Sequence, residues 1–330
     1  MVSYNAILLQ GLRLVAYTDD RINRVKGNPA VSATNKRRFK AHFGADPVVL
    51  LKIWNDLHTT ANLPAGHDPS DANKLLSAKG LLQAMHFLKS YKTELEREAL
   101  FDESPKAIRN DCWYHLERLQ ALKADKIAFP DDFGDDIWIM TVDGTNCAIN
   151  EPIHPVCSQD TTCFSHKHKR SGLTVELGIH LYENKLIWMN GPIPAGQTND
   201  KGIFALEGGL MAKLKEIKKK ALGDKIYGGD PEQCSTFNAY DCKAVKMFKS
   251  RAQMRHEQFN GMLKECASLD SRFQHGEAKF KVCFETAAVV CQCRLENGEP
   301  LFDVLAGFEG ALDDEESDSD ESDAESDDEE

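Results

Sequence analysis

The chain has 330 residues, of which 42% are hydrophobic, so it is long enough to form one large domain or two. Its formal net charge of -12 is concentrated at one end, because residues 313–330 hold 13 of the 52 acidic residues and no Lys or Arg. The remaining 39 acidic residues face 40 Lys and Arg. The body is therefore nearly neutral, which excludes a uniformly acidic protein and leaves room for basic patches.

The cellular compartment is indicated by what the sequence lacks. MVSYNAILLQGLRLVAY has no long apolar core and no small-residue cleavage site, and no window approaches the roughly 18 apolar residues of a membrane span. The 10 cysteines are scattered without a regular framework. We expect an intracellular protein with reduced thiols that is neither secreted nor membrane-spanning. NKRRFK, residues 35–40, fits a nuclear import signal as well as an ordinary solvated surface, and we expect a nuclear location.

Helical patterns dominate the first third of the chain. Residues 1–35 show weak periodicity and several turn residues, so we expect an arm with one short helix. DPVVLLKIWNDLHTT predicts a helix that Asp46 and Pro47 begin. SDANKLLSAKGLLQAMHFLKSY predicts another helix, ending near Ser90.

The next two helices predict a helix-turn-helix. Thr93 caps a short helix, and after FDES a longer one begins at Ser104 with the apolar stripe Ile108, Cys112, Leu116, Leu119 and Leu122. Off that stripe lie the candidates to face DNA: Lys106, Arg109, Asn110 and Arg118. A plain helical bundle with solvated charges has the same pattern and stays open. We expect this all-helical DNA-binding region, residues 1–130, to end where ADKIAFPDDFGDD interrupts the pattern.

Strand signals follow. IWIMTVDGT predicts a buried strand that stops at Asp143, and LTVELGIHLY with KLIWMNGPI predicts a hairpin. AGQTNDKGIFALEGGLMAKLKEIKKK predicts a loop and a helix of about 15 residues, and DKIYGGD a short strand. A long helix from Asp241 to near Ala267 completes the α/β pattern.

This predicted arrangement positions three acidic residues: Asp143 at the end of the first strand, Asp200 after the third strand, and Glu257 on the long helix. Carboxylate oxygens are the ligands that Mg²⁺ and Mn²⁺ prefer, and such ions catalyse phosphodiester cleavage. The helix face of Glu257 is small and polar, with Gln253 one turn away. Spacing alone leaves the simpler readings open, namely a turn at Asp143 and a solvated Glu257.

Residues 133–305, approximately, resemble the nuclease domain of PIF/Harbinger-type DDE transposases. VDGTNCAINEP is similar to the segment of the first acid, GPIPAGQTNDKGIF to that of the second, and RAQMRHEQFNGMLK to that of the third. FSHKHKRSGLTVEL and LGDKIYGGD are similar to intervening segments, although Lys225 and Ile226 stand where the family often has small residues. FLKSYKTELEREALFDESPKAIRNDCWYHL is similar to the helical DNA-binding region that precedes the domain.

The resemblance implies an RNase H-like nuclease domain at residues 131–308, a mixed sheet with flanking helices, whose metal ligands are Asp143, Asp200 and Glu257. It implies a DNA endonuclease or transposase in which Mg²⁺ or Mn²⁺ activates water, after which the freed 3′ hydroxyl joins target DNA. A host-adopted, non-catalytic DNA-binding or interaction factor stays open as the alternative.

DNA is the partner that follows from this resemblance, together with a separate Myb-like DNA-binding protein; the sequence leaves the oligomeric state open. Besides Lys106 and Arg109, the candidates to contact phosphates are Lys167, Lys169, Arg170, Arg251, Arg255 and Lys264.

Three further segments carry expectations. HPVCSQDTTCFSHKH spaces four potential zinc ligands, His154, Cys157, Cys163 and His166, although a plain polar loop is the alternative. Cys291 and Cys293 are expected on one face of a buried segment. Residues 309–330 are expected to form a disordered acidic tail, whose serines are open to phosphorylation and which can occupy basic surface in place of nucleic acid.

Overall fold

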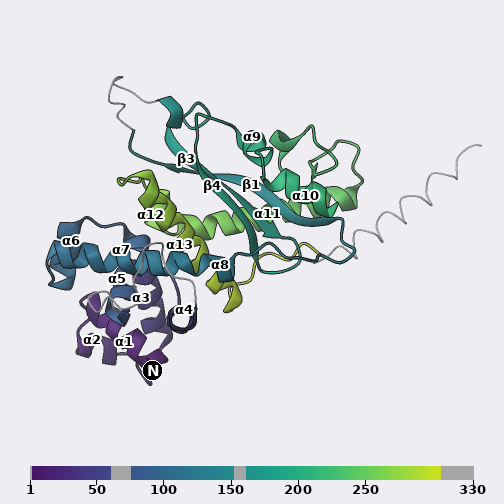
Figure 1. The fold of residues 1–330 in the computed structure, drawn as a ribbon. Coiled ribbons are helices and arrows are strands. Elements are labelled where there is room, and N and C mark those ends of the chain that lie inside the picture. The colour runs from purple at the N-terminus through teal and green to yellow at the C-terminus, as the bar shows by residue number, and fades with distance from the viewer. Residues whose placement is uncertain (1, 61–75, 152–160, 306–330) are drawn as a thin grey trace, which may run out of the picture.

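The structure is a computed structural model that describes residues 2–60, 76–151 and 161–305 (Figure 1). Its first part is helical, with α1 Tyr4–Leu14, α2 Asp19–Asn23, α3 Ala33–Phe43, α4 Pro47–Thr59, α5 Ala78–Ser90, α6 Glu94–Phe101, α7 Pro105–Ala121 and α8 Lys123–Lys126. The predicted helices of this region are confirmed. The acidic tail lies outside the described residues.

Helix caps explain why sequence reasoning located these helices. Asp46 accepts a hydrogen bond from the backbone of Val48 at the start of α4. Thr93 and Glu96 form a capping box at α6, and Ser104 caps α7. These side chains satisfy backbone N–H groups that a helix start leaves without partners.

The prediction of an arm at residues 1–35 is wrong, because α1, α2 and the start of α3 are packed helices. Leu8 and Leu12 of α1 are fully buried. Gly11 lies against the Phe39 ring, where a Cβ would come within 2.4 Å of a ring carbon. The turn residues that weakened the helical pattern lie between these helices.

A mixed sheet forms the second part. Its strands are β1 Trp138–Ala148, β2 Phe164–Ser165, β3 Arg170–His180, β4 Leu186–Pro194, β5 Lys220–Leu222 and β6 Cys234–Ser235. β3 pairs antiparallel with β1 on one side and with β2 and β4 on the other, whereas β5 and β6 continue the sheet parallel to β1. The predicted hairpin of β3 and β4 is confirmed.

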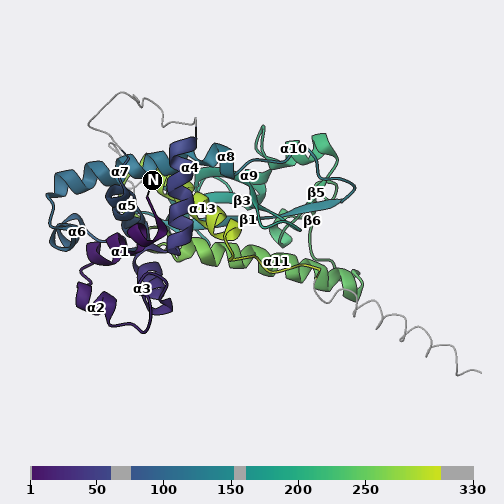
Figure 2. The same ribbon diagram turned by 90° about the horizontal axis from the view of Figure 1, so that it is seen from below.

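Helices cover both faces of this sheet. α9 Asp200–Phe204 and α10 Leu210–Ile217 lie on one face and α11 Lys243–Lys264 on the other (Figure 2). α12 Ala267–Asp270 and α13 Glu277–Glu296 follow. The expected helix of about 15 residues is divided into α9 and α10, because Gly208 adopts φ +69° between them.

Two strand predictions are wrong in position. β1 does not stop at Asp143 but continues to Ala148, since its antiparallel partner β3 pairs along the whole length. DKIYGGD is not a strand: Asp224 caps the 3-10 helix η2 Lys225–Tyr227, and the strand, β5, comes just before it. Asp224 therefore follows a strand.

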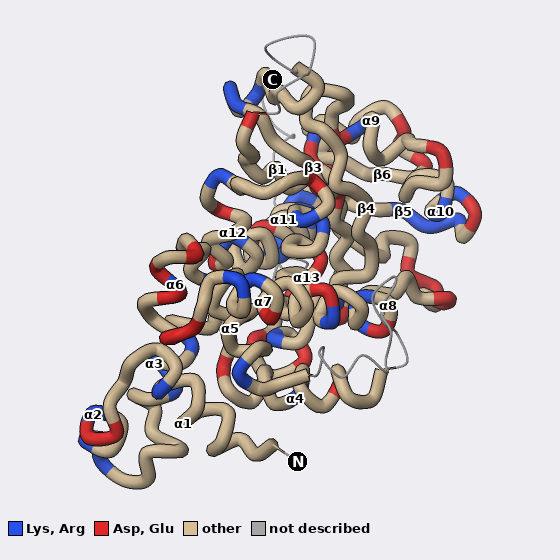
Figure 3. The backbone as a smooth tube through the Cα atoms, turned by 60° about the vertical axis from the view of Figure 1, so that its left-hand side comes forward, with Lys and Arg blue, Asp and Glu red and all other residues tan. Residues whose placement is uncertain are grey.

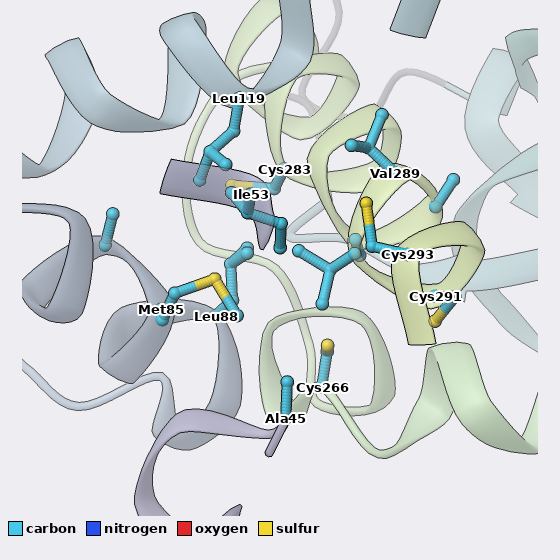
Figure 4. Packing of buried hydrophobic residues seen from close by; sticks show 14 of the residues in the cluster. Ala45, Ile53, Met85, Leu88, Leu119, Cys266, Cys283, Val289, Cys291 and Cys293 are labelled. Carbon is cyan, nitrogen blue, oxygen red and sulfur yellow. The ribbon is translucent and has the colours of Figure 1, made fainter. Parts of the chain in front are cut away.

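α13, which the sequence did not predict, connects the two parts. Its residues 283–295 are buried on all sides, so the helix has no amphipathic period to detect. The largest hydrophobic core contains residues of the N-terminal helices, α13 and β3, and Figure 4 shows Leu119 and Ile53 facing Cys283 and Val289. The helical region before residue 130 and the sheet after it thus share one hydrophobic core.

The cysteines of the described residues are nine free thiols. Burial raises the pKa of the Cys112 and Cys266 thiols to about 11, which makes them unreactive. Cys291 and Cys293 are buried as expected, but on different sides of α13, because residues two apart do not share a helix face. No helix in the described part of the chain is long and apolar enough to cross a membrane.

Candidate functional site

From Thr141 to Cys147, the odd-numbered side chains of β1 face α11. Thr141 Oγ1 shares a 2.8 Å hydrogen bond with His256 Nδ1, and Thr145 Oγ1 donates to Asn260 Oδ1 at 2.6 Å. Because successive side chains of a strand point to opposite faces, Asp143 faces α11 as well. The hydrogen bonds of Thr141 and Thr145, on either side of Asp143, thus hold this part of β1 against α11 and fix the position of Asp143.

A recess opens beside Asp143, with walls from β1, β5, the segment after β6, and α11. Asp224 and Glu257 line it together with Asp143. β5 runs parallel to β1 and their pairing ends at Thr141 and Leu222, so the carboxyl end of β5 delivers Asp224 next to Asp143. Glu257, on α11, is exposed. We call this recess the acidic pocket.

The charges of the neighbouring carboxylates act on Asp143. Burial raises the pKa of Asp143 to about 7, and the charges of Asp200, Asp224 and Glu257 add to that rise, whereas a hydrogen bond from the Gly144 backbone opposes it. Within the described residues no Lys, Arg or His forms an ion pair with these four acids. The pocket-lining Lys249 pairs with Asp241 instead, at 2.7 Å.

Asp200 lies on the opposite face of β1. A Cβ on Gly144, an even-numbered position, would come within 2.1 Å of Asp200 Oδ1. Only glycine therefore admits the Asp200 carboxylate against the strand. Burial raises the pKa of Asp200, while the charge of Lys167 lowers it. Asp200 is close enough to act on Asp143 electrostatically but does not line the acidic pocket.

The face of β1 that carries Asp200 also holds a fully buried acid. Glu176 of β3 pairs with Gly144 and is 0% exposed. One of its carboxylate oxygens accepts a hydrogen bond from Trp188 Nε1 at 2.8 Å; the other has no partner in the described structure. Burial raises its pKa to about 7. The hydroxyl of Tyr227, also fully buried, has no partner there either.

The donor set fits a hard divalent cation, because carboxylate oxygens without a paired cation are what Mg²⁺ and Mn²⁺ bind. In the present side-chain positions, no three His, Cys, Asp or Glu of the described chain converge on one metal position. Asp143 Oδ1 is turned toward the Gly144 backbone, and Glu257 is exposed. Ligation of one ion would need the carboxylates of Asp143, Asp224 and Glu257 to move closer together within the acidic pocket.

Of the predicted DNA contacts, six residues are exposed, namely Lys106, Arg109, Asn110, Lys167, Lys169 and Arg170. Lys167 and Arg170 lie at the tip between β2 and β3, and the charge of Lys167 acts on Asp200. On α7, Lys106 is exposed, and Arg109 is exposed but donates to the carboxylate of Glu94, through Nε at 2.6 Å. Figure 3 shows Lys and Arg interspersed with Asp and Glu over the helical region. DNA binding by α6 and α7 stays a prediction.

The structure contradicts a DNA-contacting role for two arginines. Arg118 is buried and donates to the carbonyl of Leu57 at 2.8 Å. Arg255 is 2% exposed and donates to three backbone carbonyls, those of His180, Glu183 and Phe302. Both guanidinium groups satisfy buried carbonyls, which explains why they face inward.

Two other predicted DNA contacts, Lys264 and Arg251, interact with groups of the protein itself. Lys264 Nζ donates to the carbonyls of Asn146 and Leu269, at 3.0 and 3.1 Å. The Arg251 guanidinium lies 5.3 Å from the centre of the Phe302 ring. The exposed hairpin tip with Lys167 and Arg170 is therefore the better candidate for phosphate contacts.

Two sequence motifs lie in other positions. Of the four potential zinc ligands, His154 and Cys157 lie outside the described residues, Cys163 is buried and His166 is exposed. NKRRFK lies on α3, where Asn35 and Phe39 are buried and Lys40 pairs with Glu299 at 2.8 Å. These positions test neither the prediction of a zinc site nor the prediction of a nuclear import signal.

No family model, no curated protein and no solved structure matches this chain. Its function is therefore inferred from the fold and the acidic pocket.

Sequence reasoning did not assign Asp224 to the site. The expected strand was placed after Asp224 instead of before it, because β5 has only three residues and follows a run of lysines. The signal that marks the strand is the buried pair Ala221 and Leu222 directly before Gly223 and Asp224.

Proposed function

We propose that this protein is a divalent-metal-dependent DNA nuclease or transposase with an RNase H-like fold, as its resemblance to DDE transposases implies. The observation that supports this most is the convergence of Asp143, Asp224 and Glu257 on one pocket from three separate elements. Three antiparallel strands extended by two parallel ones, with helices on both faces, form the mixed sheet expected for that fold.

Asp224, in this proposal, takes the ligand position that the sequence assigned to Asp200. Asp143, Asp224 and Glu257 would hold Mg²⁺ or Mn²⁺, which when bound lowers the pKa of a water and stabilises the leaving oxygen in phosphodiester cleavage. Burial makes the charge of Asp143 costly without a counterion, so it favours cation binding. Asp200 lies behind β1 and adds negative potential.

The chain's own residues would orient the DNA. Lys167 and Arg170, at the exposed tip between β2 and β3, would bind backbone phosphates on the Asp200 side. The hydrogen bond between Thr141 and His256 holds α11 against β1. That contact holds the backbone of Asp143 next to the backbone of Glu257, which positions the two acids for one ion.

The test is nicking of supercoiled plasmid with Mg²⁺ or Mn²⁺, read beside Mn²⁺ binding by calorimetry. We expect metal-dependent nicking that Glu257→Gln and Asp224→Asn abolish, with weaker Mn²⁺ binding in both. Glu117→Gln, at an exposed acid of α7, is the matched control and should behave as wild type.

Other outcomes select the alternative. Wild-type protein that binds DNA but neither nicks it nor binds Mn²⁺, even with a Myb-like partner supplied, would favour the non-catalytic binding factor. Nicking that survives in Glu257→Gln would contradict the site.

A further inference from the structure

We infer that Tyr240 stacks on an unpaired DNA base at the mouth of the acidic pocket, so that the substrate carries unpaired nucleotides beside the reacting phosphate. This inference rests on the proposed function and adds the form of its substrate. Its first support is exposure. Tyr240 is 95% exposed, whereas a tyrosine normally buries most of its ring.

The ring is held outward by an ordered turn. The Tyr240 backbone N–H donates to Asn238 Oδ1 at 3.1 Å, and the Asn238 N–H donates to Asp241 Oδ2 at 3.0 Å. Lys249, itself buried, donates to Asp241 Oδ2 at 2.7 Å and to the Thr236 carbonyl at 2.8 Å. The fold thus uses a buried lysine to fix the loop that presents Tyr240.

The turn adjoins the acidic pocket. Ser235, at the end of β6, and Phe237 both line the pocket, as does Lys249. Tyr240 is three residues beyond Phe237, so their Cα atoms lie within about 11 Å of each other at full extension of the chain. A strand with its phosphate at the pocket can therefore bring a neighbouring base to this ring.

Charge favours nucleic acid as the occupant. Lys225 follows the pocket acid Asp224 directly, and Lys246 lies on the first turns of α11; both are exposed. Exposed lysines beside an aromatic ring are the combination that binds single strands, with phosphates on the cations and bases on the ring. The sequence neighbours of Tyr240 in the turn are Asn238, Ala239 and Asp241, which are small or polar and add no large apolar side chain to the ring.

The experiment uses the full chain without divalent metal, so that no DNA is cut. Fluorescence anisotropy compares a blunt duplex with the same duplex carrying a short single-stranded overhang. We expect wild type to prefer the overhang about 5-fold or more and Tyr240→Ala to lose that preference, as stacking of ~1 kcal/mol or more requires. Tyr240→Phe should keep it, and Val31→Ala, at an exposed residue far along the chain, is the control.

A second measurement, by fluorescence, shows whether the unpaired base lies against Tyr240. 2-Aminopurine in the overhang should be quenched by wild type and Tyr240→Phe but not by Tyr240→Ala. An unchanged overhang preference in Tyr240→Ala, or its loss in Tyr240→Phe, would overturn the inference. Because binding is measured without metal, such a result beside intact metal-dependent nicking rejects the stacking role alone. An overhang preference that depends on Tyr240, together with no metal-dependent nicking by the wild-type protein, rejects the nuclease activity instead.

Discussion

The two faces of β1 both carry acids, yet only one face brings several acids together in a pocket. On the α11 face, Asp143 opens onto a pocket that Asp224 and Glu257 also line. On the α9 face, Glu176 is fully buried and Asp200 lies against Gly144. Metal binding needs several acids that line one pocket, whereas an acid outside that pocket acts on the metal through its charge. The comparison therefore separates acids that would hold a metal from acids that shape the potential around it.

Asp143→Asn should have the largest effect, because it removes the acid at the centre of the pocket while preserving side-chain shape. We expect metal-dependent nicking to fall by about 1,000-fold or more, with DNA binding unchanged. Plasmid nicking and anisotropy measure the two properties. Nicking at the wild-type rate would reject the α11 face as the site.

The comparison is sharpened by Asp224→Asn beside Asp200→Asn, two identical changes on opposite faces. If sharing the pocket decides, Asp224→Asn should approach the loss seen for Asp143, whereas Asp200→Asn should cost about 10-fold or less, as removal of a charge behind the site would. Mn²⁺ affinity should follow the same order. The reverse order would return the ligand role to Asp200, as the sequence alone suggested.

Gly144→Ala tests the α9 face of β1. The new Cβ would meet Asp200 Oδ1 at 2.1 Å and Thr174 Cγ2 at 3.3 Å, so we expect a loss of about 1–3 kcal/mol in the free energy of unfolding. In an Asp200→Ala background the first clash disappears. Urea unfolding of the four proteins of this double-mutant cycle should then show a smaller cost for Gly144→Ala. Equal costs in both backgrounds would mean that Asp200 does not press on the strand.

Much of the fold could be predicted because local signals agreed with tertiary packing. Thr93 and Ser104 mark helix starts with their own side chains, and the α7 stripe is buried as its spacing predicts. α13 could not be predicted, because a helix buried on every side shows no period. β5 was missed since three residues are too few to show alternation.

The site was predictable in part for the same reason. Asp143 and Glu257 stand on long elements whose patterns were clear, and they do reach one pocket. Asp224 depends on β5, so an error in one short strand removed it from the predicted site. Asp200 has the right neighbours in sequence, but which face of β1 it occupies depends on the packing of α9 and on Gly144.

Glu176 gives the α9 face of β1 a pH dependence. Its pKa of about 7 lies above its ordinary value, so the folded protein keeps a proton that the unfolded chain releases near pH 4 to 5. This contribution to stability is present at low pH and is lost as pH rises through about 7. Glu176→Gln cannot ionise and should melt higher than wild type at pH 8, with the difference shrinking toward pH 5. Melting curves across that range, without metal, measure it; a difference that is independent of pH would contradict the burial argument.

The smallest expected effect concerns Lys167, on the rim beside Asp200. As one exposed phosphate contact among several, Lys167→Ala should weaken DNA binding modestly and reduce the slope of log affinity against log salt by about 1, without changing the melting temperature. Arg255→Ala should do the opposite, because Arg255 satisfies buried carbonyls: stability falls while the salt slope holds. A salt titration of both variants decides whether exposure, rather than charge alone, identifies the residues that meet DNA. If Lys167→Ala leaves the slope unchanged, DNA approaches the α11 face from elsewhere, and Lys225 and Lys246 become the next residues to replace.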